Sequence, residues 1–209
     1  KKTEMDAYAN SSGGHALSRK AKNILEDSRE YIASCFGAAP NEITFTSGGT
    51  EADNWIIKTP FIDKDTTVAE LTTTQIEHEA VLASAENVHS KGFNVNFVSC
   101  DSEGVTNIDE FKNSINSNTL IASVMYANNE TGVVQPIQEI SKMVKDINPN
   151  ALFHSDVVQA VATKKLNFHN LGIESAAISG HKIGGPKGIG VMFLKTGYKI
   201  PSFLHGGKQ

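Results

Sequence analysis

Residues 42–58 read EITFTSGGTEADNWIIK, and this stretch indicates the fold class of the chain. EITFT alternates polar and apolar residues, as a short half-buried strand does. SGG is a turn, and TEADNWIIK is typical of a helix. A strand, a glycine turn and a helix in direct succession form the opening of a βαβ unit. The stretch therefore predicts strands that alternate with helices.

The same alternation continues on both sides of this stretch. Apolar or small residues recur every three or four positions over 16–36 and predict an amphipathic helix that ends at Gly37. Cys35 falls on the stripe expected to be buried. Further strands are expected near 68–73, 94–99 and 120–125 and in ALFHS, ESAAIS and IGVMFL, and further helices near 78–90, 108–115 and 136–147. This pattern predicts an α/β domain of three layers, with a mostly parallel sheet flanked by helices.

Composition narrows the functional classes. The chain has 209 residues, 39% of them hydrophobic and 20% charged, with a net charge of -4. It shows no general basic surface and no apolar run near the roughly 18 residues of a membrane helix, so we expect neither nucleic acid nor a membrane as its main partner. The two cysteines, Cys35 and Cys100, have no metal-binding spacing. They favour a reducing compartment, which makes the cytoplasm the expected location.

Polar clusters at 47–54, 154–159 and 179–190 follow three of the expected strands. In a parallel sheet, binding sites gather beyond the carboxyl ends of the strands. Gly48 and Gly49 would let the backbone approach an anion, and the N–H groups of Gly49 and Thr50 would open a helix whose dipole favours phosphate. A glycine turn before a helix is as often simple loop geometry, so both interpretations stay open.

The other two clusters supply a carboxylate and a lysine. Asp156 follows an apolar strand, where it either caps a helix or meets a cation such as a protonated pyridine nitrogen. Lys182 lies between Ser179, His181 and a glycine-rich stretch, just after the apolar run AAIS. Partial burial would favour the neutral amine that forms a Schiff base, although most lysines are solvated surface residues.

Five segments together resemble a known family. TFTSGGTEADN, EHEAV, ANNETG, HSDVVQAV and SGHKIGGPKGIG are similar, in the same order, to the signatures of class V aminotransferase-like enzymes, and most similar to those of cysteine desulfurases. The resemblance extends from about Tyr8 to the final HGGKQ. It implies the large domain of fold-type I pyridoxal 5'-phosphate enzymes over residues 16–209, preceded by a partial N-terminal segment, 1–15.

The resemblance also implies a role for each matching residue. Lys182 would form the aldimine with pyridoxal phosphate, Asp156 would pair with the pyridine nitrogen, and His78 would stack on the ring and carry a proton. A histidine that opens a helix can also be only a cap. The remaining implied contacts are Asn128 and Gln159 to the phenolic oxygen, and Gly49, Thr50, Ser179 and His181 to the phosphate.

The implied activity is removal of sulfur from L-cysteine, which leaves L-alanine and an enzyme persulfide. The sulfur would pass to a scaffold for iron–sulfur clusters or to a tRNA-thiolation protein, and the full-length enzyme would be a homodimer. The family's nucleophilic cysteine lies in a C-terminal small domain that this chain lacks, so we expect the chain to be truncated and inactive alone. The alternatives are selenocysteine lyase or an aminotransferase, half of a split enzyme, or a non-catalytic cofactor-binding module.

Overall fold

The computed structural model describes residues 7–206, which form a single seven-stranded sheet with helices on both faces. The strand order is β1-β7-β6-β5-β4-β2-β3. The strands are β1 (Ile43–Thr46), β2 (Glu70–Thr74), β3 (Asn94–Val98), β4 (Thr119–Ser123), β5 (Leu152–Asp156), β6 (Ser175–Ser179) and β7 (Gly190–Leu194). Neighbouring strands from β6 to β3 are parallel, and β7 runs antiparallel to β6 and β1. The expected mostly parallel sheet is confirmed.

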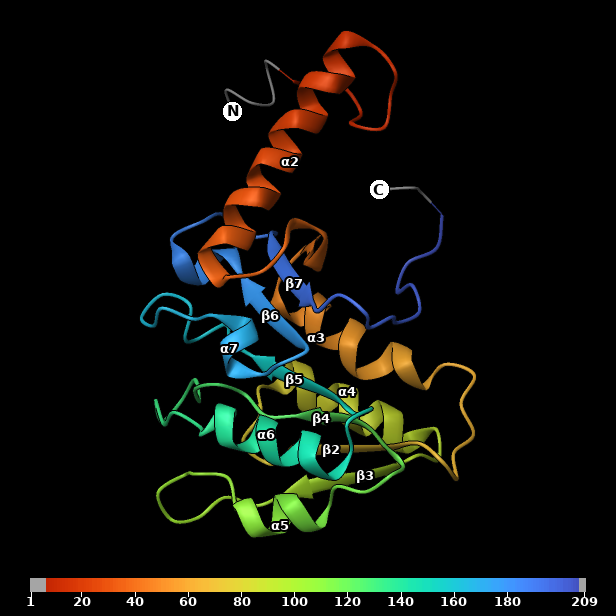
Figure 1. Ribbon diagram of the computed structural model, residues 1–209, viewed down its shortest axis with the longest axis vertical. Helices are drawn as coiled ribbons and strands as arrows, with labels where there is room; N and C mark the ends of the chain where they lie inside the picture. Colours follow the sequence, from red (N-terminus) through yellow and green to blue (C-terminus); the bar gives the residue numbers. More distant parts are fainter. Residues whose placement is uncertain (1–6, 207–209) are drawn as a thin grey trace.

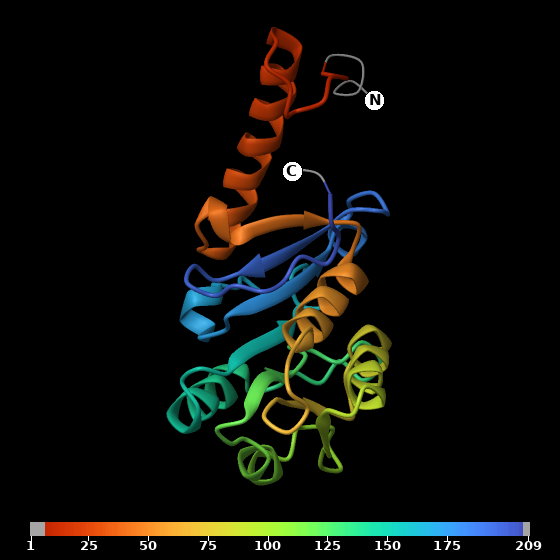
Figure 2. The ribbon, with the colours of Figure 1, turned by 90° about the vertical axis from the view of Figure 1, so that its right-hand side faces the viewer.

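The helices form the two outer layers (Figures 1 and 2). On one face lie α3 (Gly49–Lys58) and α4 (Glu79–Ser90), and on the other lie α6 (Ile137–Ile147) and α7 (Phe168–Leu171), with α5 (Ile108–Asn113) beside α6. Short 3-10 helices connect some elements: η1 (Pro40–Glu42), η2 (Thr59–Phe61) and η3 (Gly180–Ile183). The three-layer architecture is therefore also confirmed. Over residues 7–206, no helix combines the length and apolar character needed to cross a membrane.

The core is divided by the sheet, because successive residues of a strand point to opposite faces. On β5, Phe153 joins the apolar cluster that contains Ile140 and Val144 of α6, whereas Leu152 joins the cluster that contains Ile56 of α3. Burying each such side chain contributes about 1.5–3 kcal/mol. This alternation determines which residues of β5 face α3. Residues of the functional site lie on that face.

Helix α2 (Ala16–Phe36) points away from the sheet (Figures 1 and 2). It ends as the sequence predicts, at Gly37 with φ +65°, whose N–H bonds to the carbonyl of Ala33. Only Ser18 and Ala33 on the helix are buried. The prediction that Cys35 is buried is wrong, because Cys35 is exposed and Cys100 only half-buried. The apolar stripe has the predicted period, but most of the helix has nothing packed against it within the described residues.

The division into segments 1–15 and 16–209 stays a prediction. Helix α2 begins at Ala16, immediately after His15, whose ring accepts a hydrogen bond from the N–H of Ser18. Residues 1–6 and 207–209, which include the end of the HGGKQ segment, lie outside the described residues.

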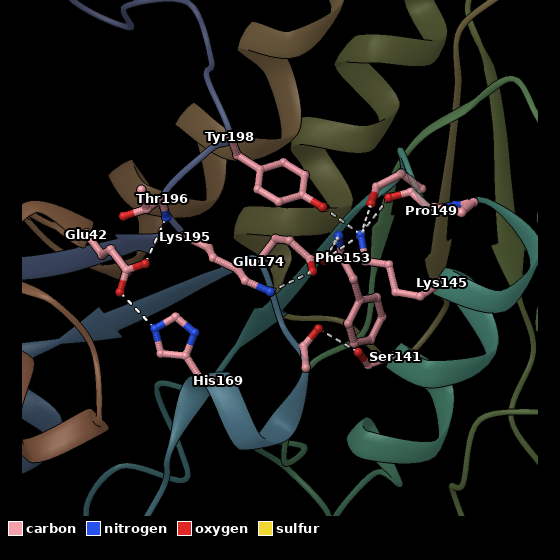
Figure 3. A network of polar contacts seen from close by, with 12 residues as sticks. Glu42, Ser141, Lys145, Pro149, Phe153, His169, Glu174, Lys195, Thr196 and Tyr198 are labelled. Atoms are coloured by element: carbon pink, nitrogen blue, oxygen red, sulfur yellow. Dashed lines mark hydrogen bonds and ion pairs between the residues drawn. The ribbon is translucent and has the colours of Figure 1, made fainter.

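A polar network ties α6, β5 and β6 together at the end of the sheet where β5 and β6 begin (Figure 3). Glu174, which is buried, accepts a hydrogen bond from the N–H of Phe153 at 3.0 Å. Its carboxylate pairs with Lys145 Nζ at 3.0 Å and lies 3.8 Å from Lys195 Nζ. Lys145 also donates to the hydroxyl of Tyr198 at 2.9 Å. The buried carboxylate of Glu174 therefore has two partly exposed lysines as partners.

We expect Glu174→Ala to lower the free energy of unfolding by about 2–3 kcal/mol, because it leaves the buried N–H of Phe153 without an acceptor and two lysines without their counter-ion. Urea unfolding followed by circular dichroism measures the change. Glu86→Ala, on the exposed side of α4, is the matched control and should change stability by less than about 0.5 kcal/mol. Equal stability of the two variants would show that the network contributes nothing.

Candidate cofactor site

A cavity of about 220 Å³ opens where β5 and β6 end and α3 begins. This is the position expected for a binding site in a sheet of parallel strands. Its lining residues are Gly49, Thr50, Asp53, His78, Met125, Asn129, Asp156, Val158, Gln159, Ser179, His181 and Lys182. Of the residues to which the resemblance gives a role in the cofactor site, all but Asn128 line this cavity.

The first turn of α3 presents backbone donors to this cavity. Its N-cap is Gly48, which has no side chain to cap the helix. The N–H groups of Gly49 and Thr50 have no hydrogen-bond acceptor among residues 7–206, as is usual for the first turn of a helix. A Cβ atom on Gly49 would lie 2.8 Å from Val158 Cγ2, so a larger residue would push into the cavity wall. Free donors at a positive helix end suit an anion such as phosphate.

Packing requires the glycine at position 190, whereas a Cβ atom on Gly48 would meet open space. Its φ of 165° is extended backbone that any residue adopts. The constraint lies across from it, because a Cβ atom on Gly190 would come within 2.5 Å of Gly48 Cα. Part of the glycine content of the two loops is therefore explained by the close approach of β7 to the turn before α3.

Asp156 is the last residue of β5 and is only 5% exposed. Its Oδ1 accepts a hydrogen bond from the N–H of Val158 at 2.8 Å, and its other oxygen is left for a ligand. Burial, and secondarily the nearby Asp53 carboxyl, raise the pKa of Asp156 to about 7. No helix follows directly, so Asp156 closes a turn and does not cap a helix. A cationic partner in the cavity would favour its charged form.

Lys182 lies on η3, at the mouth of the cavity. The sequence predicts that this lysine is partly buried, but the structure places it among exposed residues. Beside it, Ser179 Oγ and His181 Nδ1 are 2.8 Å apart and hydrogen-bonded. The three polar side chains of the SGHK segment thus line one edge of the cavity, with the amine free to reach a ligand.

His78 both caps a helix and lines the cavity. Its Nδ1 accepts a hydrogen bond from the N–H of Ala80 at 3.1 Å, at the start of α4. The two interpretations of this residue are therefore compatible. Because Nδ1 is an acceptor, the neutral ring carries its proton on Nε2. Gln159, which follows β5, also lines the cavity.

Asn128 does not line this cavity, whereas its neighbour Asn129 does. Asn128 Nδ2 donates to the carbonyl of Ile76 at 2.8 Å, and its Oδ1 accepts from the N–H groups of Glu130 and Thr131. The side chain organises the NNETG loop beside β4. Its contact with the phenolic oxygen of a cofactor stays a prediction.

Three buried titratable residues around the cavity were missed from the sequence: Asp53, Glu77 and His154. Burial raises the pKa values of Asp53 and Glu77 to about 8 and lowers that of His154 to about 4. His154 Nε2 lies 3.1 Å from Asp53 Oδ1. The sequence offered two signals: Asp53 lies inside an expected helix, and His154 lies inside an apolar strand. Only the fold shows that the two side chains meet.

These pKa values predict a pH-dependent stability for the cofactor-free protein. Asp53 and Glu77 have folded pKa values above their ordinary values of 3.8 and 4.5, so the folded state holds more protons and its stability falls as pH rises towards 8. His154 contributes in the opposite direction only below its ordinary pKa of 6.5. Between pH 6.5 and 8, stability should therefore fall, by up to about 1.4 kcal/mol per pH unit for each proton.

Glu77→Gln should flatten this dependence, because glutamine keeps an oxygen for the N–H of Met125, now 2.7 Å from Glu77 Oε1, and removes the ionisation. Urea unfolding at several pH values measures the slope. Glu79→Gln, two residues further along and exposed, should leave the slope unchanged. An unchanged slope in Glu77→Gln would show that Glu77 does not titrate in this range.

Residues 2–209 match the family described as aminotransferase class-V. The chain belongs to this family. A cysteine desulfurase IscS of Clostridium botulinum is 39% identical over 202 residues, which cover 97% of this chain and 50% of that protein. A cysteine desulfurase of Nostoc sp. is 40% identical over 204 residues, covering 98% of this chain and 50% of the relative. The chain spans about half the length of these class-V relatives.

Solved structures agree with the sequence relatives. A NifS-like protein superposes with a TM-score of 0.95 at 36% identity, covering 99% of this chain and 57% of the other. A structure described as SspA in complex with cysteine superposes with a TM-score of 0.94 at 32% identity, covering 100% of this chain and 60% of the other. Enzymes of the class-V family use pyridoxal phosphate.

The residues present fit that cofactor. Free N–H groups and hydroxyls at Gly49, Thr50 and Ser179 suit a phosphate, and the free oxygen of Asp156 suits a pyridine N–H. Lys182 supplies an amine at the rim of the same cavity. These residues stand on different elements, α3, β5, β6 and η3, which the fold brings together around one cavity.

Proposed function

We propose that this chain is the cofactor-binding part of a pyridoxal-phosphate-dependent cysteine desulfurase, which takes sulfur from L-cysteine and leaves L-alanine. The observation that carries the proposal is the meeting of Lys182, Asp156 and His78 with the first turn of α3 around one cavity. The similarity to cysteine desulfurases over 97% of the chain supports it.

In this proposal, each residue has one task. The N–H groups of Gly49 and Thr50, with Ser179 and His181, hold the phosphate. Asp156 holds a proton on the pyridine nitrogen by pairing with it as a carboxylate, and the bound cofactor then supplies an electron sink for bonds at the substrate's Cα and Cβ. Lys182 would hold the cofactor covalently through Nζ.

His78 is proposed to face the cofactor ring and to move protons. Its neutral ring carries a proton on Nε2, because Nδ1 accepts the N–H of Ala80. Nε2 of His78 would then be the atom that holds or gives a proton next to the cofactor. The hydrogen bond at Nδ1 fixes the orientation of the imidazole ring. Gln159 is proposed to contact the phenolic oxygen, together with Asn128 after a change in the NNETG loop.

The sulfur is proposed to leave as a persulfide on a cysteine outside this chain. Neither Cys35 nor Cys100 lines the cavity. Cys35 is exposed, but it lies near the end of α2, and a reactive thiol requires an electropositive surrounding at the site of transfer. The proposed acceptors are an iron–sulfur scaffold or a tRNA-thiolation protein, and the proposed setting is a cytoplasmic homodimer.

The experiment that tests this function supplies L-cysteine to the protein loaded with pyridoxal phosphate and measures alanine, sulfide and protein persulfide. The chain alone and the chain joined to the remaining half of a relative's length are compared. Alanine and persulfide from the joined protein only would support the proposal. Alanine from selenocysteine but not cysteine would assign a selenocysteine lyase, and amino-group transfer to a keto acid would assign an aminotransferase.

A further inference from the structure

A chain of three buried polar side chains connects the elements that carry the site. His154 on β5 is 0% exposed and stands between Asp53 on α3 and Ser175 on β6, which are 1% and 0% exposed. His154 Nε2 lies 3.1 Å from Asp53 Oδ1, and His154 Nδ1 lies 2.8 Å from Ser175 Oγ. Both ring nitrogens are therefore used, each by a different neighbouring element.

Two of these three residues, Asp53 and His154, are close in sequence to groups of the cofactor site. Asp53 follows Gly49 by four residues, so it lies one helical turn below the free N–H groups on the same face of α3. His154 precedes Asp156 by two residues, so both side chains leave the same face of β5. A shift at the Asp53–His154 contact would thus be passed directly to both groups.

Hydrogen bonds can fix this placement where apolar packing cannot. The apolar contacts beneath α3 come from small and aliphatic side chains such as Ala52, Ile56 and Ala177. Such contacts are non-directional and tolerate small shifts of the helix, whereas a hydrogen bond weakens steeply when its angle changes. A binding site has to be held within about 0.5 Å of its productive geometry.

We propose that the chain Ser175–His154–Asp53 is a positioning device, which fixes the first turn of α3 relative to β5 and so sets the place of the phosphate-binding N–H groups relative to the Asp156 carboxylate. The inference rests on the proposed function, because it assumes that pyridoxal phosphate occupies the cavity. Asp53 also lines the cavity, so the chain begins at the ligand space itself.

Protonation is consistent with an uncharged chain. Burial holds the pKa of Asp53 above neutrality and that of His154 below it. The carboxyl O–H of Asp53 then donates to Nε2, and the N–H at Nδ1 donates to Ser175 Oγ. On this face of β5, Asp156 is then the residue whose carboxyl group becomes negatively charged when a cation binds in the cavity.

Two substitutions at one position test the device. The amide oxygen of glutamine can take the position of histidine Nε2 and accept the O–H of Asp53, and the amide nitrogen of asparagine can take the position of Nδ1 and donate to Ser175 Oγ. His154→Gln therefore keeps a partner for Asp53, whereas His154→Asn keeps a partner for Ser175 only. Dissociation constants are measured for pyridoxal phosphate and for pyridoxal, which lacks the phosphate.

We expect His154→Asn to weaken pyridoxal phosphate by about tenfold and pyridoxal by less than about twofold, and His154→Gln to stay within about threefold of the wild type for both. A purely structural role would weaken both ligands alike in both variants, and that result would overturn the proposal. If His154→Asn does not fold, Ser175→Ala takes its place, and again only the phosphorylated ligand should weaken.

The two proposals fail in different ways. If the wild-type protein does not bind pyridoxal phosphate on Lys182, the proposed function is wrong. If it does bind, and His154→Asn leaves both dissociation constants unchanged, the cofactor site stands and only the positioning device is wrong.

Discussion

Lys182→Ala should abolish covalent attachment of pyridoxal phosphate and lower turnover of L-cysteine by at least about 10³-fold. Lys182 on η3 lines the same cavity as the proposed phosphate-binding residues and Asp156. Loss of the visible absorbance band of the bound cofactor and loss of alanine formation measure the two effects.

The glycine-rich loop offers a matched control for this change. Lys187 lies five residues further along the same loop and is exposed, but it does not line the cavity. Lys187→Ala should therefore keep both the absorbance band and the turnover. An absorbance band that survives in Lys182→Ala and disappears in Lys187→Ala would show that the cofactor is attached to Lys187, which contradicts the prediction.

Asp156→Asn should leave the cofactor attached to Lys182 but lower turnover by about 10²–10³-fold. The amide keeps an oxygen for the N–H of Val158, now at 2.8 Å, so the local turn survives. It removes the charge that holds a proton on the pyridine nitrogen, and electrostatic contacts of this kind commonly account for a loss of that size.

The measurements for Asp156→Asn are the absorbance band, alanine formation and exchange of the substrate's α-proton with deuterated solvent. Asp146→Asn, on an exposed position of α6, is the control. Full α-proton exchange in Asp156→Asn would contradict the role given to Asp156, whatever the overall turnover.

Local features of the fold could be predicted from the sequence. Helix α2 begins and ends where its apolar period and Gly37 indicate, and β5 and β6 coincide with the runs ALFHS and ESAAIS to within a few residues. Each signal is contained in neighbouring residues, through side-chain period or turn geometry. The same holds for SGGT and SGHK, whose positions after strands place them at the cavity.

Long-range features could not be predicted in this way. The pairing of β1 with β7 joins segments about 150 residues apart, and nothing in either strand specifies the other. Cys35 has the period of a buried residue, but its exposure depends on whether another segment covers α2. Likewise, Asp53 and His154 are 101 positions apart, so their contact follows from the packing of α3 on the sheet.

The most direct test of the account is to find the lysine that carries the cofactor. The protein is incubated with pyridoxal phosphate, reduced with borohydride and digested, and the peptides are analysed by mass spectrometry. The account predicts one modified peptide, with the reduced cofactor on Lys182. A cofactor adduct on another lysine in the wild-type protein, or no adduct at all, would contradict it.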